Sequence, residues 1–239
     1  MAMSWEFELN DIATIHDLAD RPRRVRARRG EGERLRDEIL DAAEKLLVET
    51  EDADEVSIRA ISQMVGVTAP SIYRHFEDKD ALVVAACQRA YGRFDDYMEA
   101  AVADAPDALH NLKGRALAYV RFALENPGQY RVLFMSSKTH SHTLGSEHQY
   151  AFDPDRSEIQ ALVHLVQAVQ RAQDEGLLEL HATPMEMAVM LWSIVHGMAS
   201  LRIAQPEMPW PEPEQQVDQM FHVMAFGLCP QSVRDQLRG

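Results

Sequence analysis

The stretch VSIRAISQMVGVTAPSIYRHF, at positions 56–76, constrains the fold of this chain more than any other feature. Ser57 can cap a first helix, and apolar residues follow it at helical spacing. Gly66 then provides the backbone freedom of a sharp turn. Thr68 can begin a second short helix, in which Pro70 is tolerated because it lies in the first turn. The pattern predicts a helix-turn-helix.

Two short helices around a glycine turn have two interpretations. They can form a structural corner that only packs against other helices. They can also form a DNA-binding unit, in which the second helix enters the major groove and presents its N-terminal residues to the base edges. Spacing alone leaves both interpretations open.

The motif Ile-Ser-Gln-x-x-Gly-Val-x-x-x-Ser-Ile-Tyr-x-His-Phe begins at Ile61 and is followed by Lys79, Ala81 and Leu82. It resembles the DNA-binding domain of the TetR/AcrR repressor family, over roughly residues 33–100. The acidic link EDADE at positions 51–55 departs from that family, which usually has a shorter link with a Gly followed by an aromatic residue. Because this link would repel phosphate, we expect it to point away from DNA.

The family motif and the expected helix N-termini indicate which residues would contact DNA. A helix is expected to start near Asp78, so that its partial positive charge and Lys79 together form a phosphate site. The expected base contacts are Arg59, Thr68, Ala69 and Ser71, and the expected phosphate contacts are Ser57, Tyr73, His75 and Lys79.

The charge of the chain is unusual for a DNA-binding protein but is unevenly distributed. The formal net charge is −14 over 239 residues, yet eight arginines lie between positions 21 and 36. Within this basic arm, Arg24, Arg26 and Arg28 are expected to follow phosphates or to enter the minor groove, where arginine is favoured. A solubility tail is the alternative for the arm. Residues 1–20 are expected to be a disordered leader, with a weak amphipathic face of Ile12, Ile15 and Leu18 as the alternative.

Composition also indicates the compartment. The two cysteines, Cys87 and Cys229, are far apart and lack a metal-ligand spacing, which fits a reducing cytosol. No apolar run reaches the length of a membrane span, and the N-terminus has no signal-peptide pattern. We therefore expect a cytoplasmic protein without a membrane partner.

Helical periodicity continues through the rest of the chain and predicts an all-α fold. Three parts are expected: residues 1–32 as leader and Arg-rich arm, 33–100 as a three-helix helix-turn-helix domain, and 101–239 as a helical ligand-binding and dimerisation domain. The predicted helices are 33–50, the two of the motif, one from about residue 78, and then 107–125, 129–135, 157–176, 184–204 and 213–228, with a polar loop at 136–155.

The last two long helices are too apolar for the surface of a monomer. In the TetR/AcrR family the corresponding helices pair with their copies in a second subunit as a four-helix bundle, and a twofold dimer also suits a palindromic DNA site. The residues expected at this dimer interface are Met198, Leu201, Val217, Met220, Phe221 and Met224.

A second resemblance concerns the C-terminal half. Residues 119–134, YVRFALENPGQYRVLF, together with Trp192, His196 and Gly197, resemble the WHG type of TetR-like ligand domain. It implies a pocket among the helices, because apolar pockets with a few polar groups are the usual small-molecule sites. The expected lining is Tyr119, Phe122, Phe134, Met135, Leu162, Val166, Trp192 and His196, and ordinary core packing is the alternative for each of them.

The remaining function classes find less support in the sequence. No nucleophile–base arrangement or phosphate loop is present, so no catalytic residue and no cofactor is expected. His140, His142 and His148 are close in sequence, but no carboxylate or cysteine completes a recognised spacing, and no metal is expected. The prediction is a homodimeric repressor that a small, lipophilic effector releases from a palindromic operator. A constitutive architectural DNA binder with a solid C-terminal core remains the alternative.

Overall fold

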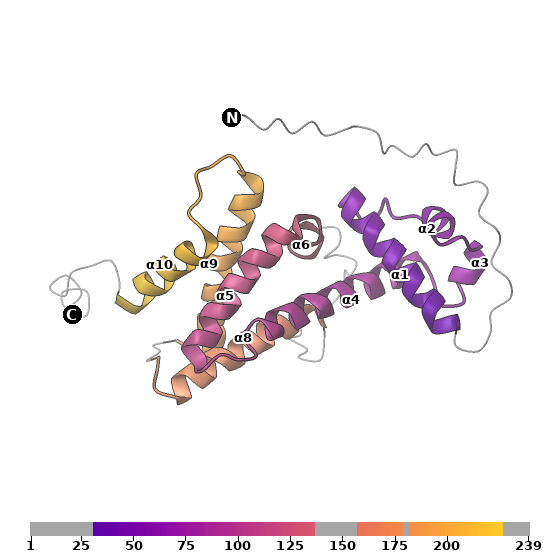
Figure 1. Cartoon of the computed structure of the whole chain (residues 1–239). Coiled ribbons are helices and arrows are strands. Elements are labelled where there is room, and N and C mark those ends of the chain that lie inside the picture. Colours follow the sequence, from indigo (N-terminus) through magenta and orange to yellow (C-terminus); the bar gives the residue numbers. More distant parts are fainter. Residues whose placement is uncertain (1–30, 137–156, 179–181, 227–239) are drawn as a thin grey trace.

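The computed structural model describes residues 31–136, 157–178 and 182–226, and these residues form helices joined by turns and short links (Figure 1). No strand occurs among them, so the predicted all-α class is confirmed. Several predicted segments lie outside the described residues. They are the expected leader, the arginine arm, most of the polar loop at 136–155 and the last two residues of the predicted helix 213–228.

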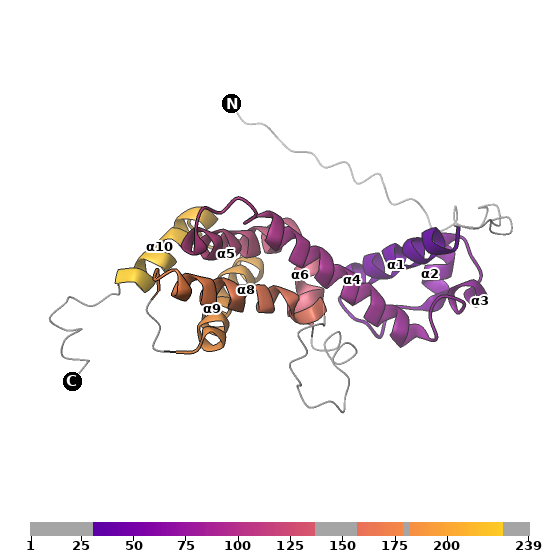
Figure 2. The same cartoon turned by 90° about the horizontal axis from the view of Figure 1, so that it is seen from below.

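The N-terminal helices form a small bundle at one end of the molecule (Figures 1 and 2). It consists of α1 (Glu31–Thr50), α2 (Ile58–Val65), α3 (Ala69–Ile72) and the first half of α4 (Lys79–Ala100). Their apolar faces meet in what we call the N-terminal core, which includes the fully buried side chains of Ile39, Leu40, Val56, Ile61, Ile72, Leu82 and Val83.

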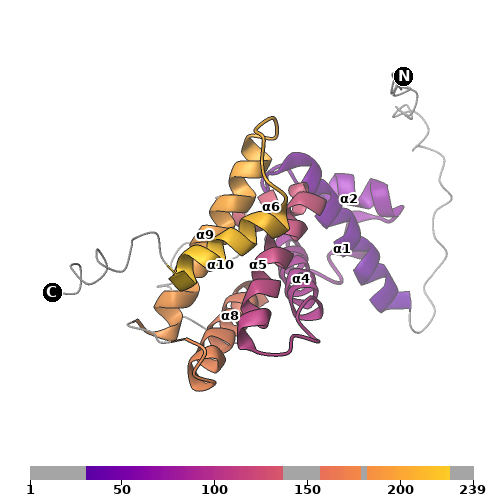
Figure 3. The ribbon, with the colours of Figure 1, turned by 60° about the vertical axis from the view of Figure 1, so that its left-hand side comes forward.

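The C-terminal helices form a second bundle that also includes the second half of α4 (Figures 1 and 3). They are α5 (Ala108–Glu125), α6 (Pro127–Phe134), α8 (Ser157–Asp174), α9 (Pro184–Ala204) and α10 (Pro213–Phe226). α5 packs against α8, α9 and α10, and α8 lies along both α4 and α9. Their centre, here called the aromatic core, includes Tyr91, Phe94, Met98, Tyr119, Phe122, Tyr130 and Leu133.

Side-chain caps explain why several helices begin where they do. The carboxylate of Asp78 accepts a hydrogen bond from the backbone N–H of Ala81 at 2.7 Å, which fixes the start of α4 as predicted. Thr183 and Glu186 form a reciprocal capping box at the start of α9, with hydrogen bonds of 3.2 and 2.8 Å. The prediction placed the start of α6 at residue 129, but the helix begins at Pro127, because proline is tolerated at the first helical position.

α4 contributes to both cores. Leu82, Val83 and Cys87 belong to the N-terminal core, and two turns later Phe94 and Met98 belong to the aromatic core. The helix is uninterrupted between these two sets of contacts, so the two halves of the molecule share one continuous element (Figure 2).

α6 makes a second connection between the two cores. Its Val132 is buried in the N-terminal core, whereas Tyr130 is buried in the aromatic core. The guanidinium of Arg131 forms an ion pair with Glu51 at 3.1 Å, just beyond the end of α1. Gly128 allows a close approach, because a Cβ at this position would lie 2.5 Å from Cγ1 of Val48 on α1.

α9 was expected to be buried, but part of it is exposed. Ala188, Leu191 and Val195 face inward, while Val189 and Leu201 are 42% and 53% exposed. The sequence pattern predicts that α9 is buried on all sides, but the described residues leave part of its apolar face open to solvent.

Replacing Gly128 by alanine tests the close approach of α6 to α1. Alanine favours a helix over glycine, but its Cβ would overlap Val48. We expect Gly128→Ala to lower the free energy of unfolding by about 1–3 kcal/mol, since overpacking forces neighbouring helices apart. Urea denaturation measures this change, and adding Val48→Ala should recover most of the loss.

Gly92→Ala provides the matched control. Gly92 is also helical, on α4, and a Cβ there would meet no atom within 4 Å. This substitution should raise the free energy of unfolding by about 0.5–1 kcal/mol. Equal effects of the two substitutions would contradict the proposed contact between α6 and α1.

Candidate functional site

The predicted helix-turn-helix is present, and local interactions explain its geometry. The hydroxyl of Ser57 accepts a hydrogen bond from the backbone N–H of Ala60 at 3.2 Å and so caps α2. Gly66 has a φ of 76°, in the left-handed region that favours glycine, and its N–H donates to the carbonyl of Ser62 at 2.9 Å. The chain then turns directly into α3.

α3 is short, and one buried side chain anchors it. Ile72 has no exposed surface and packs into the N-terminal core. Thr68 precedes the helix in an extended conformation, and its hydroxyl lies 3.1 Å from that of Ser71. This arrangement leaves the first turn of α3 accessible from solvent.

The DNA-contact residues predicted in this part of the chain lie around α2 and α3. Ser57, Arg59, Thr68 and Tyr73 are exposed, whereas Ala69, Ser71 and His75 are half-buried. The arginines expected in the basic arm, Arg24, Arg26 and Arg28, lie outside the described residues.

Lys79 has a role that the sequence did not indicate. Its ammonium donates hydrogen bonds to the carbonyl oxygens of Ala53 and Asp54, at 3.2 and 3.0 Å. It therefore ties the acidic link at 51–55 to the start of α4, so the link lies beside this candidate phosphate contact, although we expected it to point away from DNA. A lysine ammonium has three donors, so these two bonds leave capacity for a phosphate oxygen.

Several aromatic side chains predicted around a ligand site come together in the aromatic core. The indole N–H of Trp192 donates to the hydroxyl of Tyr119 at 3.2 Å. The hydroxyls of Tyr119 and Tyr130 lie 3.1 and 2.7 Å from Nδ1 of His196. The rings of Tyr130 and His196 are stacked, with centroids 5.7 Å apart. We call these four residues the tyrosine–histidine network.

Burial keeps this network uncharged at neutral pH. Burial raises the pKa of the Tyr119 hydroxyl far above its usual range and raises that of Tyr130 to about 12. Burial also lowers the pKa of His196, so its imidazole is neutral and Nδ1 can accept a hydrogen bond from a tyrosine hydroxyl. The network therefore offers neutral hydrogen-bonding groups within an apolar surrounding.

The structure separates the predicted lining residues into groups. Tyr119, Phe122, Phe134, Trp192 and His196 all belong to the aromatic core or contact it. Leu162 and Val166 lie elsewhere, in a third apolar cluster with Leu112 and Val169, and Met135 is 45% exposed on the surface. Sequence periodicity cannot make this separation, because it depends on how α8 packs against α5 and α9.

Several members of the aromatic core were not predicted from the sequence, among them Tyr130 and Phe94. Tyr130 lies four residues before Phe134 on α6, a spacing that places both on one helix face. Phe94 of α4 contacts the rings of Tyr119, Phe122 and Phe134 edge-on, with centroids 4.9–5.6 Å apart. These rings pack directly against one another. This is the ordinary core packing that the sequence left open as the alternative to a ligand pocket.

A hollow in the surface lies at the junction of the two cores. Its lining includes Leu47 and Val48 of α1, Cys87 of α4 and Val132 of α6. This hollow does not coincide with the tyrosine–histidine network. It marks the place where α6 meets α1 and α4.

The predicted interface residues divide into buried and exposed sets. Val217 and Met220 are 1% and 8% exposed and pack into the aromatic core of the same chain, so they do not lie on its outer surface. Met198 and Phe221 are half-buried. Leu201 and Met224 are exposed, and further exposed apolar side chains on α9 and α10 are Val189, Met190 and Val223. We call this exposed set the α9–α10 face.

The length and composition of α9 would also let it cross a membrane, which is weak evidence by itself. Among the described residues no other helix has this property. The inward contacts of Ala188, Leu191 and Val195, and the buried Arg202 beside Gln216 of α10, are those of a helix in a soluble bundle.

Curated relatives match part of the chain. The uncharacterised HTH-type transcriptional regulator YobS of Bacillus subtilis is 32% identical over 99 residues, which are 41% of this chain and 50% of YobS. The nucleoid occlusion factor SlmA of Edwardsiella ictaluri is 26% identical over 98 residues, again 41% of this chain and 50% of SlmA. The chain spans about half the length of the curated relatives it matches.

Solved structures match most of the chain in fold. A Rhodococcus sp. RHA1 protein of unknown function is 24% identical with a TM-score of 0.63, over 82% of this chain and 96% of that one. The regulator FadR of Bacillus subtilis, solved with stearoyl-CoA, is 13% identical with a TM-score of 0.62, over 80% and 98%. At these identities the likeness concerns the fold alone.

Two family models match successive parts of the chain. Residues 39–86 match the model described as bacterial regulatory proteins, tetR family, and residues 112–226 match the one described as tetracyclin repressor-like, C-terminal domain. The first covers the helix-turn-helix and the second the helices around the aromatic core. This family is one of regulators rather than enzymes, as the sequence indicated. The chain belongs to the TetR family of transcriptional regulators and carries a tetracyclin repressor-like C-terminal domain.

Proposed function

We propose that this protein is a cytoplasmic, homodimeric repressor that binds a palindromic DNA operator and is released from it by a small lipophilic effector. The observation that carries the proposal is the helix-turn-helix, in which Ser57 and Gly66 fix the turn and the first turn of α3 is accessible. Such a helix can place its N-terminal residues against base edges in the major groove.

Different residues would read bases and hold phosphates. Arg59, Thr68, Ala69 and Ser71 are the proposed base contacts, and Ser57, Tyr73, His75 and Lys79 the proposed phosphate contacts. Arg59, Thr68 and Tyr73 are exposed, so their side chains are accessible to DNA. With its net charge of −14, the chain would depend on local positive charge, including Arg24, Arg26 and Arg28 of the arm.

Dimerisation through the α9–α10 face would bring together two DNA-reading heads, which are the helix-turn-helix bundles of the two subunits. Exposed apolar side chains gather on two consecutive helices there, and such a surface is typical of a protein–protein contact. A twofold dimer would match the symmetry of a palindromic site. Leu201 and Met224 would lie in this contact, with Met198 and Phe221 at its edge.

The tyrosine–histidine network is the proposed effector site. Trp192, His196 and Gly197 occur on α9 as in the WHG type of ligand domain, and neutral hydrogen-bonding groups among aromatic rings suit a lipophilic molecule with a polar end. The FadR that resembles this chain in fold was solved with stearoyl-CoA, which makes acyl thioesters reasonable first probes.

α6 offers a route from this site to the DNA-reading head. Tyr130 contacts His196, and Val132 on the same short helix is buried in the N-terminal core. An effector that moves Tyr130 would therefore also displace α6 against α1. It would release DNA only to the extent that it binds the released conformation more tightly.

A constitutive architectural DNA binder is the second candidate. The rings of Phe94, Phe122 and Phe134 pack closely against one another, as in a solid core without a ligand. The two candidates share the same DNA interface and differ in whether any small molecule changes the operator affinity.

Arg59→Ala tests the DNA interface. On an operator selected from random duplexes, the substitution should cost about 1–3 kcal/mol and relax the preference at one base pair. Fluorescence anisotropy titrations with each base pair changed in turn measure both effects. Arg171→Ala, which removes an arginine of α8 that pairs with Glu175 just after the helix, is the control and should leave affinity unchanged. Unchanged affinity and preference in Arg59→Ala would remove Arg59 from the interface.

Leu201→Glu tests the dimer. Leu201 is 53% exposed on one subunit, so the substitution should leave the subunit folded, while a glutamate buried between two copies would lack a partner. We expect light scattering to report a monomer with weakened operator binding, since each half-site is then held by one head alone. Leu177→Glu, at an exposed leucine in the turn after α8, should remain dimeric. A dimeric Leu201→Glu protein with tight operator binding would contradict the proposed face.

Trp192→Ala tests the effector site. Acyl thioesters that bind the folded state should raise the melting temperature of the wild-type protein and reduce operator affinity. Trp192→Ala should lose most of this response but keep its affinity for DNA. Trp210→Ala removes a tryptophan that stacks on Arg202 outside the network, and this control should respond as the wild type does. An equal response of both variants would place the effector elsewhere.

A further inference from the structure

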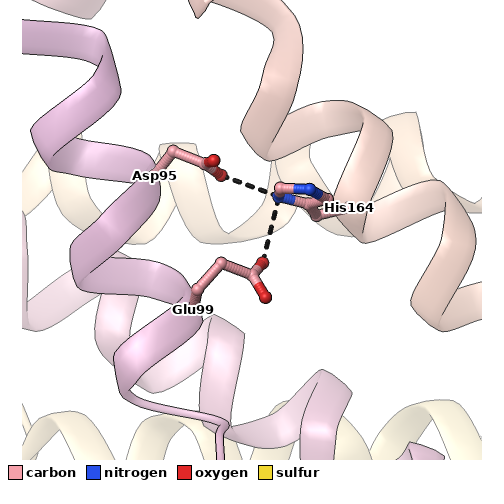
Figure 4. A group of neighbouring side chains, drawn as sticks. All are labelled: Asp95, Glu99 and His164. Carbon is pink, nitrogen blue, oxygen red and sulfur yellow. Dashed lines mark hydrogen bonds and ion pairs between the residues drawn. The ribbon is translucent and has the colours of Figure 1, made fainter. Parts of the chain in front are cut away.

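Three side chains that can bind metals converge between α4 and α8 (Figure 4). Asp95 and Glu99 lie one turn apart on the same face of α4, and His164 faces them from α8. Nδ1 of His164 is 2.9 Å from Oδ1 of Asp95 and 3.1 Å from Oε1 of Glu99. One ligand atom from each residue lies within 4.8 Å of the others, and no other such group occurs among the described residues.

These distances suit coordination of one ion. Metal–ligand distances for histidine nitrogen and carboxylate oxygen are about 2.0–2.2 Å. At the tetrahedral angles that Zn²⁺ prefers, two such ligands are about 3.4 Å apart. The two distances from the imidazole of His164 are a few tenths of an ångström shorter, so an ion could enter with small outward movements of the side chains.

The surrounding charge is also compatible with a dication. Glu99 accepts a hydrogen bond from Nη2 of the buried Arg115 at 2.6 Å, and Nε of Arg115 donates to Asn111 at 2.8 Å. With Asp95 and Glu99 ionised and His164 neutral, the four side chains carry a net charge of −1. Catalytic zinc sites with two histidines and one glutamate carry the same charge.

The alternative is a structural ion-pair network. A protonated His164 beside Asp95 and Glu99, with Arg115 next to Glu99, would leave four mutually neutralising charges. This arrangement and a metal site use the same side chains. They differ in whether the imidazole of His164 holds a proton or gives its lone pair to an ion.

We propose that Asp95, Glu99 and His164 bind a divalent first-row transition metal ion, with Zn²⁺ as the test ion, in a site that joins α4 to α8. An imidazole together with two carboxylates favours such an ion over Mg²⁺, which prefers oxygen ligands alone. Three protein ligands leave coordination positions for water or for a group of another molecule.

The site would restrain the helix that the two cores share. α4 carries Asp95 and Glu99 in its second half, and its first half is built into the N-terminal core. A bound ion would hold this helix against α8. Any resulting change in DNA affinity rests on the proposed function, whereas metal binding itself does not.

Calorimetric titration of the metal-free full chain with Zn²⁺ tests the site. Because other histidines can bind zinc, the titrated background is a variant in which His140, His142 and His148 are all replaced by glutamine. In this background we expect saturable binding of one ion per chain. Asp95→Asn and His164→Gln should each weaken it by about tenfold or more, since ligand groups are lost. Mg²⁺ at equal concentration should not compete.

His110→Gln is the matched control, because His110 also pairs with a carboxylate, that of Asp107, but no third ligand converges there. Its zinc affinity should equal that of the background variant. Circular dichroism melting of each variant without metal confirms that it is folded, and Glu99→Gln replaces any variant that is not. Three results would each overturn the proposal. They are a zinc affinity that neither His164→Gln nor Glu99→Gln changes, no saturable binding in the background variant, and equal competition by Mg²⁺.

Discussion

The structure depends on the uninterrupted helix α4, which provides apolar side chains to two cores. Its first turns pack with Leu82 and Val83 into the N-terminal core, and its later turns place Phe94 and Met98 in the aromatic core. A helix transmits displacement along its length because its backbone hydrogen bonds are continuous. The two halves of the chain therefore cannot move independently without bending α4 or giving up contacts in one core.

α6 adds a second constraint at the same junction. Gly128 lets this short helix approach α1 more closely than any other residue would allow, and Arg131 pairs with Glu51 beyond the end of α1. Because Tyr130 of α6 also contacts His196, the same eight-residue helix reaches both the helix-turn-helix bundle and the proposed effector site. Here a small shift of one side chain could change the orientation of the DNA-reading head.

Local sequence signals predicted much of the fold. Ser57, Gly66 and Asp78 act where caps and turns were expected, because capping involves residues three or four positions apart. The predicted helix 184–204 matches α9 at both ends. Its start could be predicted because Thr183 and Pro184 are typical of a helix N-terminus. The all-helical architecture was predicted from the helical spacing of apolar residues along the chain.

Contacts between distant residues were harder to predict. Val217 and Met220 lie on an apolar face of α10, and periodicity cannot tell whether such a face meets its own subunit or a partner. The pairing of Tyr130 with His196 joins residues 66 positions apart. Asp95, Glu99 and His164 form no sequence motif and meet only because α8 lies along α4.

In the proposed function, the helix-turn-helix reads DNA as part of a twofold dimer. Selection of the purified full-length protein on random DNA duplexes, followed by sequencing of the bound fraction, tests it most directly. A twofold dimer should enrich one motif with two inverted half-sites at a fixed separation. Enrichment of a single unpaired half-site would contradict the dimeric arrangement, and the absence of any enriched sequence would contradict specific DNA reading by α3.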